Sequence, residues 1–179
     1  ILDTQYAIEA GADEIDIGIN RKAFLEGDYR KVFDEIVALK EVCKDVHLKT
    51  ILEVGDLKTY ENIRKASLIS LAAGSDFIKT STGKEKINAN LNNSLVMLRM
   101  IREFYDLTGK KIGFKPAGGI SSAKSVLNFL ILMHEELGEE WLNPRLFRIG
   151  ASGLLIDIER QLYHYALGRY ATINKMAMS

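Results

Sequence analysis

The segment GADEIDIGIN, residues 11–20, contains the pattern that decides the fold. Its residues alternate along an expected strand, with three isoleucines on one face and Asp16 and Gly18 on the other. A parallel sheet covered by helices on both sides needs strands that are apolar on both faces. A carboxylate in the middle of such a strand is costly without a partner or water. A closed barrel supplies both inside it, so this segment favours a barrel over an open sheet.

Four further segments rich in β-branched residues follow this one and also predict strands. The five recur with a period of roughly 33 residues: DEIDIGI (13–19), VHLKTILEV (46–54), SDFIKTST (75–82), KIGFKPAG (111–118) and RLFRIGAS (145–152). Amphipathic stretches between them predict helices over 28–44, 58–74, 92–109 and 121–138. A last helix is expected over about 154–167, with Leu155, Ile158, Leu162 and Tyr165 on its inner face. Strands that alternate with helices indicate βα units, right-handed crossovers and a parallel sheet.

Two α/β architectures fit this pattern. An open doubly wound sheet of five strands would be complete in 179 residues. A (β/α)8 barrel has eight strands and typically about 250 residues, so three strands would be missing. Composition does not separate the two architectures, and the residues at the strand ends have to decide between them.

The composition excludes several classes of protein. Hydrophobic residues make up 47% and charged residues 27%, which is typical of a folded globular chain and not of a disordered one. The net charge is zero and no basic block occurs, so nucleic acid is not expected as a partner. No apolar run reaches membrane-span length, and the N-terminal residues do not resemble a signal peptide. The single Cys43 suits a reducing compartment, so a cytoplasmic location is expected.

Two lysines lie where strands of the barrel should end. Lys79 is inside DFIKTSTGK and Lys115 is inside KIGFKPAGGI, while Asp16 belongs to the first strand. Two ammonium groups held close together disfavour each other's protonation, which leaves one free amine as a nucleophile, and a nearby carboxylate moves protons. This arrangement indicates Schiff-base chemistry on a carbonyl group.

A structural interpretation of these charges stays open beside the catalytic one. Lysines in strands often lie at sheet edges or extend to solvent, and carboxylates at strand ends often cap a helix. In the second strand Lys49 shares a face with Ile51 and Glu53, and the pattern assigns no role to it.

Glycine-rich turns follow three of the expected strands. They are Ser81-Thr82-Gly83, Gly118-Gly119 and Gly150-Ala151-Ser152. Glycine lets the backbone approach an anion closely, and the helix that follows offers unpaired N–H donors. In barrels the loops after the seventh and eighth strands often form a phosphate site. The alternative is that these glycines only form tight turns.

The motifs GADEIDIGIN, DFIKTSTGK, GFKPAGGI and FRIGAS, in this order and spacing, resemble the deoxyribose-phosphate aldolases. This family comprises class I (Schiff-base) aldolases with a (β/α)8 TIM barrel. The resemblance runs from about residue 10 to residue 170, and ELGEEWLNPRLFRIGAS and YHYALGRYA look most like its animal branch.

The resemblance implies a role for each matching residue. Lys79 matches the imine-forming lysine, Lys115 the second lysine that perturbs it, and Asp16 the proton-relay aspartate. The family's phosphate-binding region matches Gly83, Lys84, Gly118, Gly119, Gly150 and Ser152. Where many members have a second hydroxyl residue after the GAS motif, this chain has Gly153, which implies loss of a side-chain contact but not of the backbone N–H.

The resemblance also places the five strands as about the fourth to eighth of the barrel. Residues 1–179 are then expected to be the C-terminal part of a single aldolase domain, without its first three βα units. The implied activity is reversible cleavage of the phosphosugar 2-deoxy-D-ribose 5-phosphate to glyceraldehyde 3-phosphate and acetaldehyde, in deoxynucleoside catabolism.

Cofactors and partners complete the expectations. No cofactor or metal is expected to take part, the composition already argued against nucleic acid and a membrane, and a homo-oligomer is compatible with the sequence. Two alternatives remain at this point, namely a Schiff-base aldolase or transaldolase of another specificity, and a non-catalytic barrel fragment that binds a partner.

Overall fold

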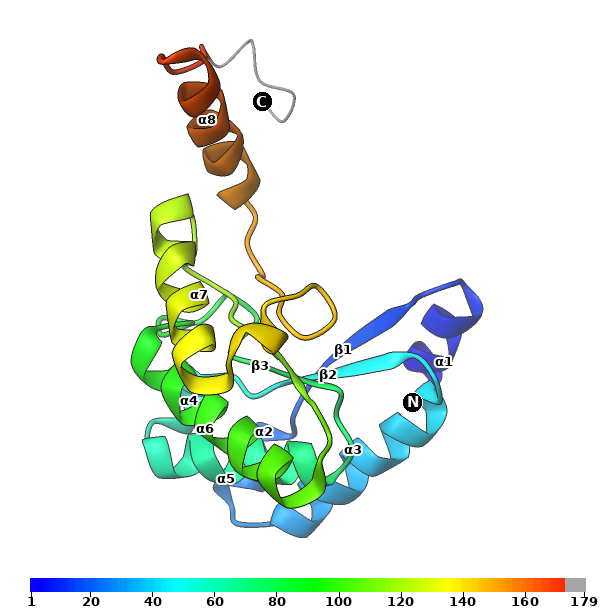
Figure 1. Ribbon diagram of the computed structural model, residues 1–179. Helices are drawn as coiled ribbons and strands as arrows, with labels where there is room; N and C mark the ends of the chain where they lie inside the picture. The colour runs from blue at the N-terminus through cyan, green and yellow to red at the C-terminus, as the bar shows by residue number, and fades with distance from the viewer. Residues whose placement is uncertain (173–179) are drawn as a thin grey trace.

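The computed structural model describes residues 1–172 and contains a parallel sheet of four strands (Figure 1). The strands are hydrogen-bonded in sequence order: β1 (Glu14–Gly18), β2 (His47–Ile51), β3 (Phe77–Lys79) and β4 (Gly113–Lys115). The helices are α1 (Leu2–Glu9), α2 (Arg21–Leu25), α3 (Tyr29–Cys43), α4 (Val54–Leu57), α5 (Tyr60–Ala72), α6 (Leu91–Thr108), α7 (Ala123–Leu137) and α8 (Leu154–Leu167), with a 3₁₀ turn at Glu139–Trp141. This order confirms the predicted α/β class with βα units and a parallel sheet.

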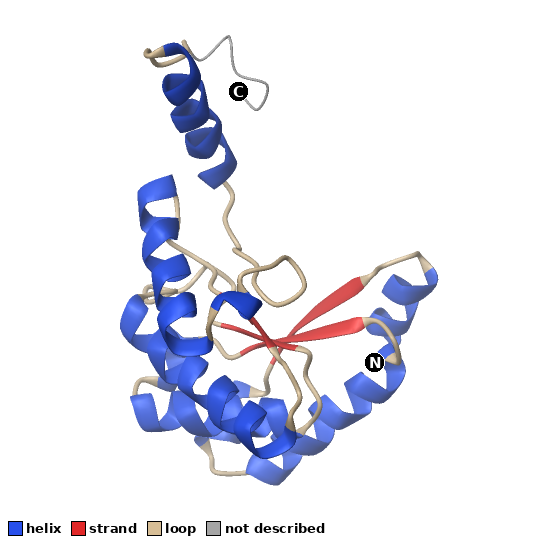
Figure 2. Cartoon of the chain, in the orientation of Figure 1, coloured by secondary structure: helices blue, strands red, loops and turns tan. Residues whose placement is uncertain are grey.

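The larger helices form a curved layer on one side of the sheet (Figure 2). In this layer α3 lies against α5, α5 against α6, and α6 against α7. Four of the predicted helices, those before α8, agree with α3, α5, α6 and α7 to within a few residues at each end. The arrangement is an arc of a (β/α) barrel, with helices outside and one strand face left inside.

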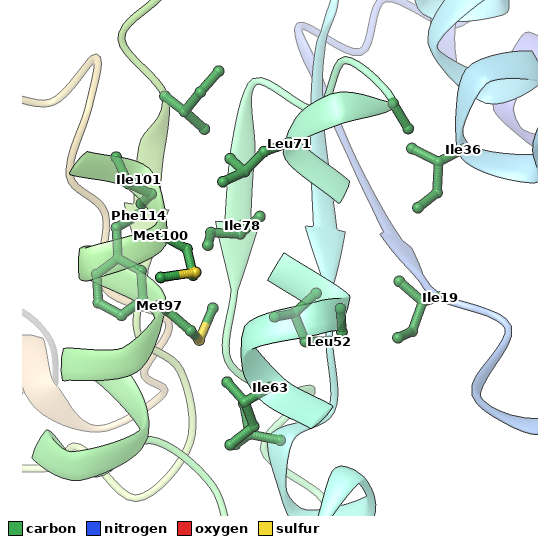
Figure 3. Close-up of a cluster of buried hydrophobic side chains, with 14 of the residues drawn as sticks. Ile19, Ile36, Leu52, Ile63, Leu71, Ile78, Met97, Met100, Ile101 and Phe114 are labelled. Atoms are coloured by element: carbon green, nitrogen blue, oxygen red, sulfur yellow. The ribbon is translucent and has the colours of Figure 1, made fainter. Parts of the chain in front are cut away.

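The core lies between the strands and this helical layer. Leu52 and Ile78 contribute from the strand side, and Met97 and Ile101 of α6 pack against the same cluster (Figure 3). All four side chains are fully buried. Full burial of one such side chain is worth about 1.5–3 kcal/mol, so this layer fixes how the strands curve.

Side-chain caps determine where the main helices begin. Asp28, Thr59 and Asn90 each accept the backbone N–H three residues later, at the start of α3, α5 and α6. Ser122 and Ser125 form a reciprocal capping box at the start of α7. These caps satisfy N–H groups that a helix start otherwise leaves unpaired.

The predicted fifth strand, residues 145–152, is present only as interrupted pairing with β4. The Phe114 N–H donates to the Leu146 carbonyl at 2.8 Å, and the Arg148 N–H donates back to the Phe114 carbonyl at 3.1 Å. The next donor of this ladder would be residue 116, which is a proline without an N–H. Pairing then resumes at Gly150, whose N–H donates to the Pro116 carbonyl at 2.9 Å.

The helix α8 differs from its prediction in what it packs against. Its bounds agree with the expected 154–167, but it extends away from the sheet beyond α7 (Figure 1). Of the predicted inner face, Leu155, Leu162 and Tyr165 are exposed, and only Ile158 packs against a buried cluster. The prediction of an inward face was therefore wrong for this structure, because an amphipathic pattern does not identify the surface that covers it.

No helix within residues 1–172 is both long enough and apolar enough to cross a membrane.

Candidate active site

Asp16 lies at the centre of a group of charged side chains on the inner face of the sheet. Its Oδ2 atom accepts a hydrogen bond from the Lys79 Nζ at 2.7 Å and another from the Lys115 Nζ, also at 2.7 Å. The two lysines are the paired last residues of β3 and β4. Asp16 lies deeper in the sheet, where β1 pairs with β2, and the long lysine side chains reach down to it. The structure thus brings together all three predicted catalytic residues.

The surroundings of Asp16 keep it ionised. Burial alone would raise the pKa of this carboxyl group. Hydrogen bonds from Lys115 and Lys79, together with their positive charge, lower the pKa of Asp16 to about 2. At neutral pH the group is therefore a carboxylate that can accept a proton from a reacting group or a water molecule.

Lys49, to which the sequence pattern assigned no role, is the most deeply buried charge of the group. Its side chain is 2% exposed, and its Nζ lies 2.6 Å from Glu14 and 3.5 Å from the Oδ1 of Asp16. Burial acts to raise the pKa of Glu14, but the hydrogen bond and charge of Lys49, with smaller contributions from the charges of Arg148 and His47, outweigh it and lower that pKa. The sequence did contain an indication of this role for Lys49. Strand alternation places Lys49 beside Asp16 if β1 and β2 pair in the observed register.

Arg148 extends this group to the fifth strand segment. Its Nη2 lies 3.1 Å from the Oε1 of Glu14. Positive and negative groups therefore alternate across the inner face, from Arg148 through Glu14, Lys49 and Asp16 to the two lysines at the strand ends. We refer to these six residues as the charge chain.

A cavity of about 550 Å³ opens above the two strand-end lysines. Both lysines line it, together with residues of the turns after β3, after β4 and after the fifth segment. Five of the six predicted phosphate-binding residues are among the lining residues, namely Gly83, Gly118, Gly119, Gly150 and Ser152. Lys84 is exposed and does not line the cavity, so the structure does not bring this predicted residue to the site.

Backbone donors around this cavity are available for an anion. The N–H groups of Gly83, Gly119, Ser152 and Gly153 donate to no acceptor within residues 1–172. Gly153 also precedes α8 without a capping side chain, which leaves the N–H groups of that helix start unpaired. Unpaired N–H groups in a concave turn, at a helix start, are typical of phosphate sites.

The turn after β4 requires glycine at its first position. Gly118 has φ +89°, and a Cβ atom there would lie 2.6 Å from the Asn88 side chain. The backbone of this turn also lies close to the turn after β3, because a Cβ on Gly83 would be 3.5 Å from the Gly118 Cα. The two turns thus form one wall of the cavity.

No group of three or more His, Cys, Asp or Glu side chains in the described residues is arranged to hold a metal ion.

Comparison with known proteins places this geometry in context. Residues 1–156 match the model of the DeoC/LacD family aldolase. The chain is 56% identical over 177 residues to the deoxyribose-phosphate aldolase of Homo sapiens, an alignment that covers 99% of this chain and 56% of that protein. It therefore spans about half the length of this curated relative. The identity confirms the expected likeness to animal members.

Two solved structures share the fold. A Toxoplasma gondii protein assigned as a deoxyribose-phosphate aldolase has a TM-score of 0.80 and 25% identity, over 92% of this chain and 64% of that chain. The tetrameric deoxyribose phosphate aldolase of Aeropyrum pernix has a TM-score of 0.68 and 19% identity, over 94% of this chain and 61% of that chain. These likenesses confirm the predicted barrel-type fold.

Proposed function

Because this chain belongs to the DeoC/LacD family of aldolases, we propose that the protein cleaves 2-deoxy-D-ribose 5-phosphate reversibly to glyceraldehyde 3-phosphate and acetaldehyde. The observation that carries the proposal is the pair of strand-end lysines on one carboxylate, beside a cavity with unpaired backbone N–H groups. The likeness to the human aldolase supports the choice of this phosphosugar among aldolase substrates.

Lys79 acts as the nucleophile in this proposal. Its neutral amine attacks C1 of the open-chain aldehyde, and the resulting carbinolamine loses water to form an imine. The second lysine, Lys115, donates to the same carboxylate oxygen as Lys79, so both amines and Asp16 belong to one hydrogen-bonded group. The imine then serves as an electron sink for cleavage of the C2–C3 bond.

Asp16 takes part in the proton transfers. It accepts the proton of the C3 hydroxyl group through water, the C2–C3 bond breaks, and glyceraldehyde 3-phosphate leaves. The bonding electrons remain on the substrate as an enamine, which is protonated at C2. Hydrolysis of the new imine releases acetaldehyde and regenerates Lys79. Such positioned proton transfers are typically worth about 10²–10⁴ in rate.

The glycine turns hold the phosphate group in this proposal. The donors are the unpaired N–H groups of Gly83, Gly119, Ser152 and Gly153, with Gly118 and Gly150 shaping the wall. Gly153 contributes only a backbone donor, as expected from its lack of a side chain. An anchored phosphate fixes the aldehyde end of the substrate near Lys79.

The proposal extends to the whole protein. We place residues 1–179 in the C-terminal part of a single (β/α)8 domain, with β1 to β4 and the segment 146–150 as five neighbouring strands. A cytoplasmic location fits the buried, unpaired Cys43, and the tetramer of the Aeropyrum pernix protein supports a homo-oligomer.

Reductive trapping on the natural protein tests the function. Acetaldehyde with borohydride should form one covalent adduct, on the peptide that contains Lys79, and the protein should release glyceraldehyde 3-phosphate from deoxyribose 5-phosphate. Peptide mass spectrometry locates the adduct, and a coupled assay measures the release of glyceraldehyde 3-phosphate. Labelling at Lys115 or Lys84 would contradict the assignment of the nucleophile.

A panel of other phosphosugars separates this aldolase from one of different specificity. A protein that cleaves none of them and forms no adduct would be a binding partner instead.

A further inference from the structure

Glu53 has a backbone conformation that is unfavourable for its residue type. It follows β2 and has φ +57° and ψ +62°, in the left-handed region that glycine adopts readily and glutamate rarely. Both neighbours hold it there, because the Leu52 N–H donates to the Lys79 carbonyl and the Val54 N–H to the Thr80 carbonyl, each at 3.0 Å. The strain is thus imposed by two bonds to the end of the strand that carries Lys79.

The side chain of Glu53 is also in an unfavourable position. The residue is 4% exposed, and no cation lies within 4.0 Å of its carboxylate among residues 1–172. Both carboxylate oxygens accept the backbone N–H of Thr82, each at 3.2 Å. A buried charge loses its hydration, and a strained backbone adds to that loss. A residue with both disadvantages, hydrogen-bonded to a residue that lines the cavity, indicates a function beyond packing.

The hydrogen bond to Thr82 controls the turn that follows β3. Thr82 and Gly83 both line the cavity. Because Glu53 takes the Thr82 N–H, that donor is not available to a ligand, while the N–H of Gly83 keeps no acceptor within the described part of the chain. The Thr82 hydroxyl in turn accepts the Lys84 N–H at 3.4 Å. The Glu53 carboxylate therefore occupies the Thr82 N–H and leaves the Gly83 N–H of the same turn unpaired.

We propose that Glu53 is a positioning residue for the phosphate group of the substrate. By holding the Thr82 N–H, it fixes the turn so that the Gly83 N–H stays available to the phosphate. This inference rests on the proposed function, since it requires a phosphate ester in the cavity. It leaves the chemistry at Lys79 untouched, so binding of the phosphate and formation of the imine respond differently to its loss.

The test compares two substitutions in the natural protein. Glu53→Gly removes the carboxylate and relieves the left-handed strain, so we expect the fold to be retained. It should raise KM for deoxyribose 5-phosphate tenfold or more, with kcat and the slow cleavage of unphosphorylated deoxyribose changed less than threefold. Glu53→Gln keeps an acceptor oxygen of the same reach and should restore KM to within about threefold of wild type.

Lys58→Gly is the matched control for the backbone. Lys58 also has a positive φ, +65°, and lies five residues along the chain, but its exposed side chain has no bond to the turn after β3. This variant should leave KM and kcat unchanged for both sugars. Three outcomes would each overturn the proposal. Glu53→Gly could lower the cleavage of both sugars equally, or it could keep the wild-type KM. Alternatively, Glu53→Gln could fail to restore KM.

Two further measurements separate this inference from the proposed function. Inorganic phosphate, titrated by calorimetry, should bind Glu53→Gly at least tenfold more weakly than wild type. Borohydride trapping of acetaldehyde on Lys79 should be unchanged. A wild-type protein that forms no adduct and cleaves no deoxyribose 5-phosphate would contradict the proposed function, whereas unchanged phosphate binding in the variant would contradict only the role of Glu53.

Discussion

Protonation of Asp16 should lower the free energy of unfolding of the protein. Its pKa is about 2 in the folded protein and 3.8 as an unperturbed group. A lowered folded-state pKa gives stability that is fully present above the unfolded value and is lost as pH falls through the folded one. The difference corresponds to at most about 2 kcal/mol, lost between roughly pH 5 and pH 1, and solvent that reaches this residue screens its charge and reduces the contribution.

Urea unfolding between pH 6 and pH 2 measures this contribution. The wild type should lose on the order of 1 kcal/mol more than Asp16→Asn over that range, because the amide has no proton to gain. Identical pH dependences of the two proteins would show that the lysines do not stabilise the Asp16 carboxylate.

Lys115 is the residue expected to hold Asp16 and Lys79 in place for imine formation. Its Nζ donates to the same Asp16 oxygen as the Lys79 Nζ, so replacement with leucine removes one of the two hydrogen bonds that fix this carboxylate. The rate of imine formation at pH 7 should then fall at least tenfold. Stopped-flow or trapping rates measure this, and an unchanged rate would leave Lys115 with a role in substrate binding or in structure only.

At the scale of an element, the turn after β4 is expected to separate phosphate binding from chemistry. Gly119→Asp puts a carboxylate beside N–H groups that the proposed phosphate needs. A charge at about 4 Å is worth about 1 kcal/mol in water and several at a lower effective dielectric constant, so KM for deoxyribose 5-phosphate should rise tenfold or more. Cleavage of unphosphorylated deoxyribose should change much less.

Gly109→Asp is the control for this substitution. Gly109 and Gly119 have similar φ values, +71° and +77°, and a Cβ atom on either meets nothing within 4 Å. Gly109 ends α6 and does not line the cavity. Gly119→Asp could instead lower the cleavage rates of both sugars equally and lower the melting temperature as much as Gly109→Asp does. In that case the turn after β4 would have only a structural role.

The elements also show how far sequence reasoning reaches. The strands and the main helices were predictable, because periodicity and caps such as Asn90 act locally. Asp16, Lys79 and Lys115 were predictable because a charge inside an apolar strand is conspicuous. Lys49 was not recognised, since its role depends on pairing with residues 33 and 35 positions earlier in the chain, Asp16 and Glu14.

Other features depended on geometry that no local pattern contains. The gap in the fifth strand arises because Pro116 falls on a donor position of the ladder, which only the register reveals. The exposed face of α8 depends on its neighbours and not on its own sequence. The left-handed conformation of Glu53 follows from hydrogen bonds of its two neighbours to Lys79 and Thr80, which are distant in the sequence, so no local sequence pattern indicated it.

At the scale of the whole molecule, the charge chain connects all strands through their inner face. Lys49 is its most buried member, with Glu14 and Asp16 as partners. Without Lys49, Glu14 keeps its contact with Arg148, and Asp16 keeps the two strand-end lysines, so neither carboxylate is left without a cation. Lys49→Met therefore loses mainly the buried hydrogen bond to Glu14, and it should destabilise the protein by about 1.5–3 kcal/mol in urea unfolding.

An exposed lysine provides the comparison for this prediction. Lys65 forms a helical ion pair with Glu61, at 3.6 Å, and its side chain is 42% exposed. Lys65→Met should change stability by less than about 1 kcal/mol. If the two substitutions lowered the free energy of unfolding by similar amounts, the charge chain would stabilise the fold no more than an exposed ion pair does.

The contact between Arg148 and Glu14 has a consequence for the order of folding. These residues are 134 positions apart, so the contact joins the first strand to the last strand segment. Contacts of such long separation require closure of a long loop, which slows their formation. We therefore expect this contact to form after the intervening strands are in register and to be absent from an early transition state. Its free energy should then slow the opening of the native arc and leave the rate of assembly nearly unchanged.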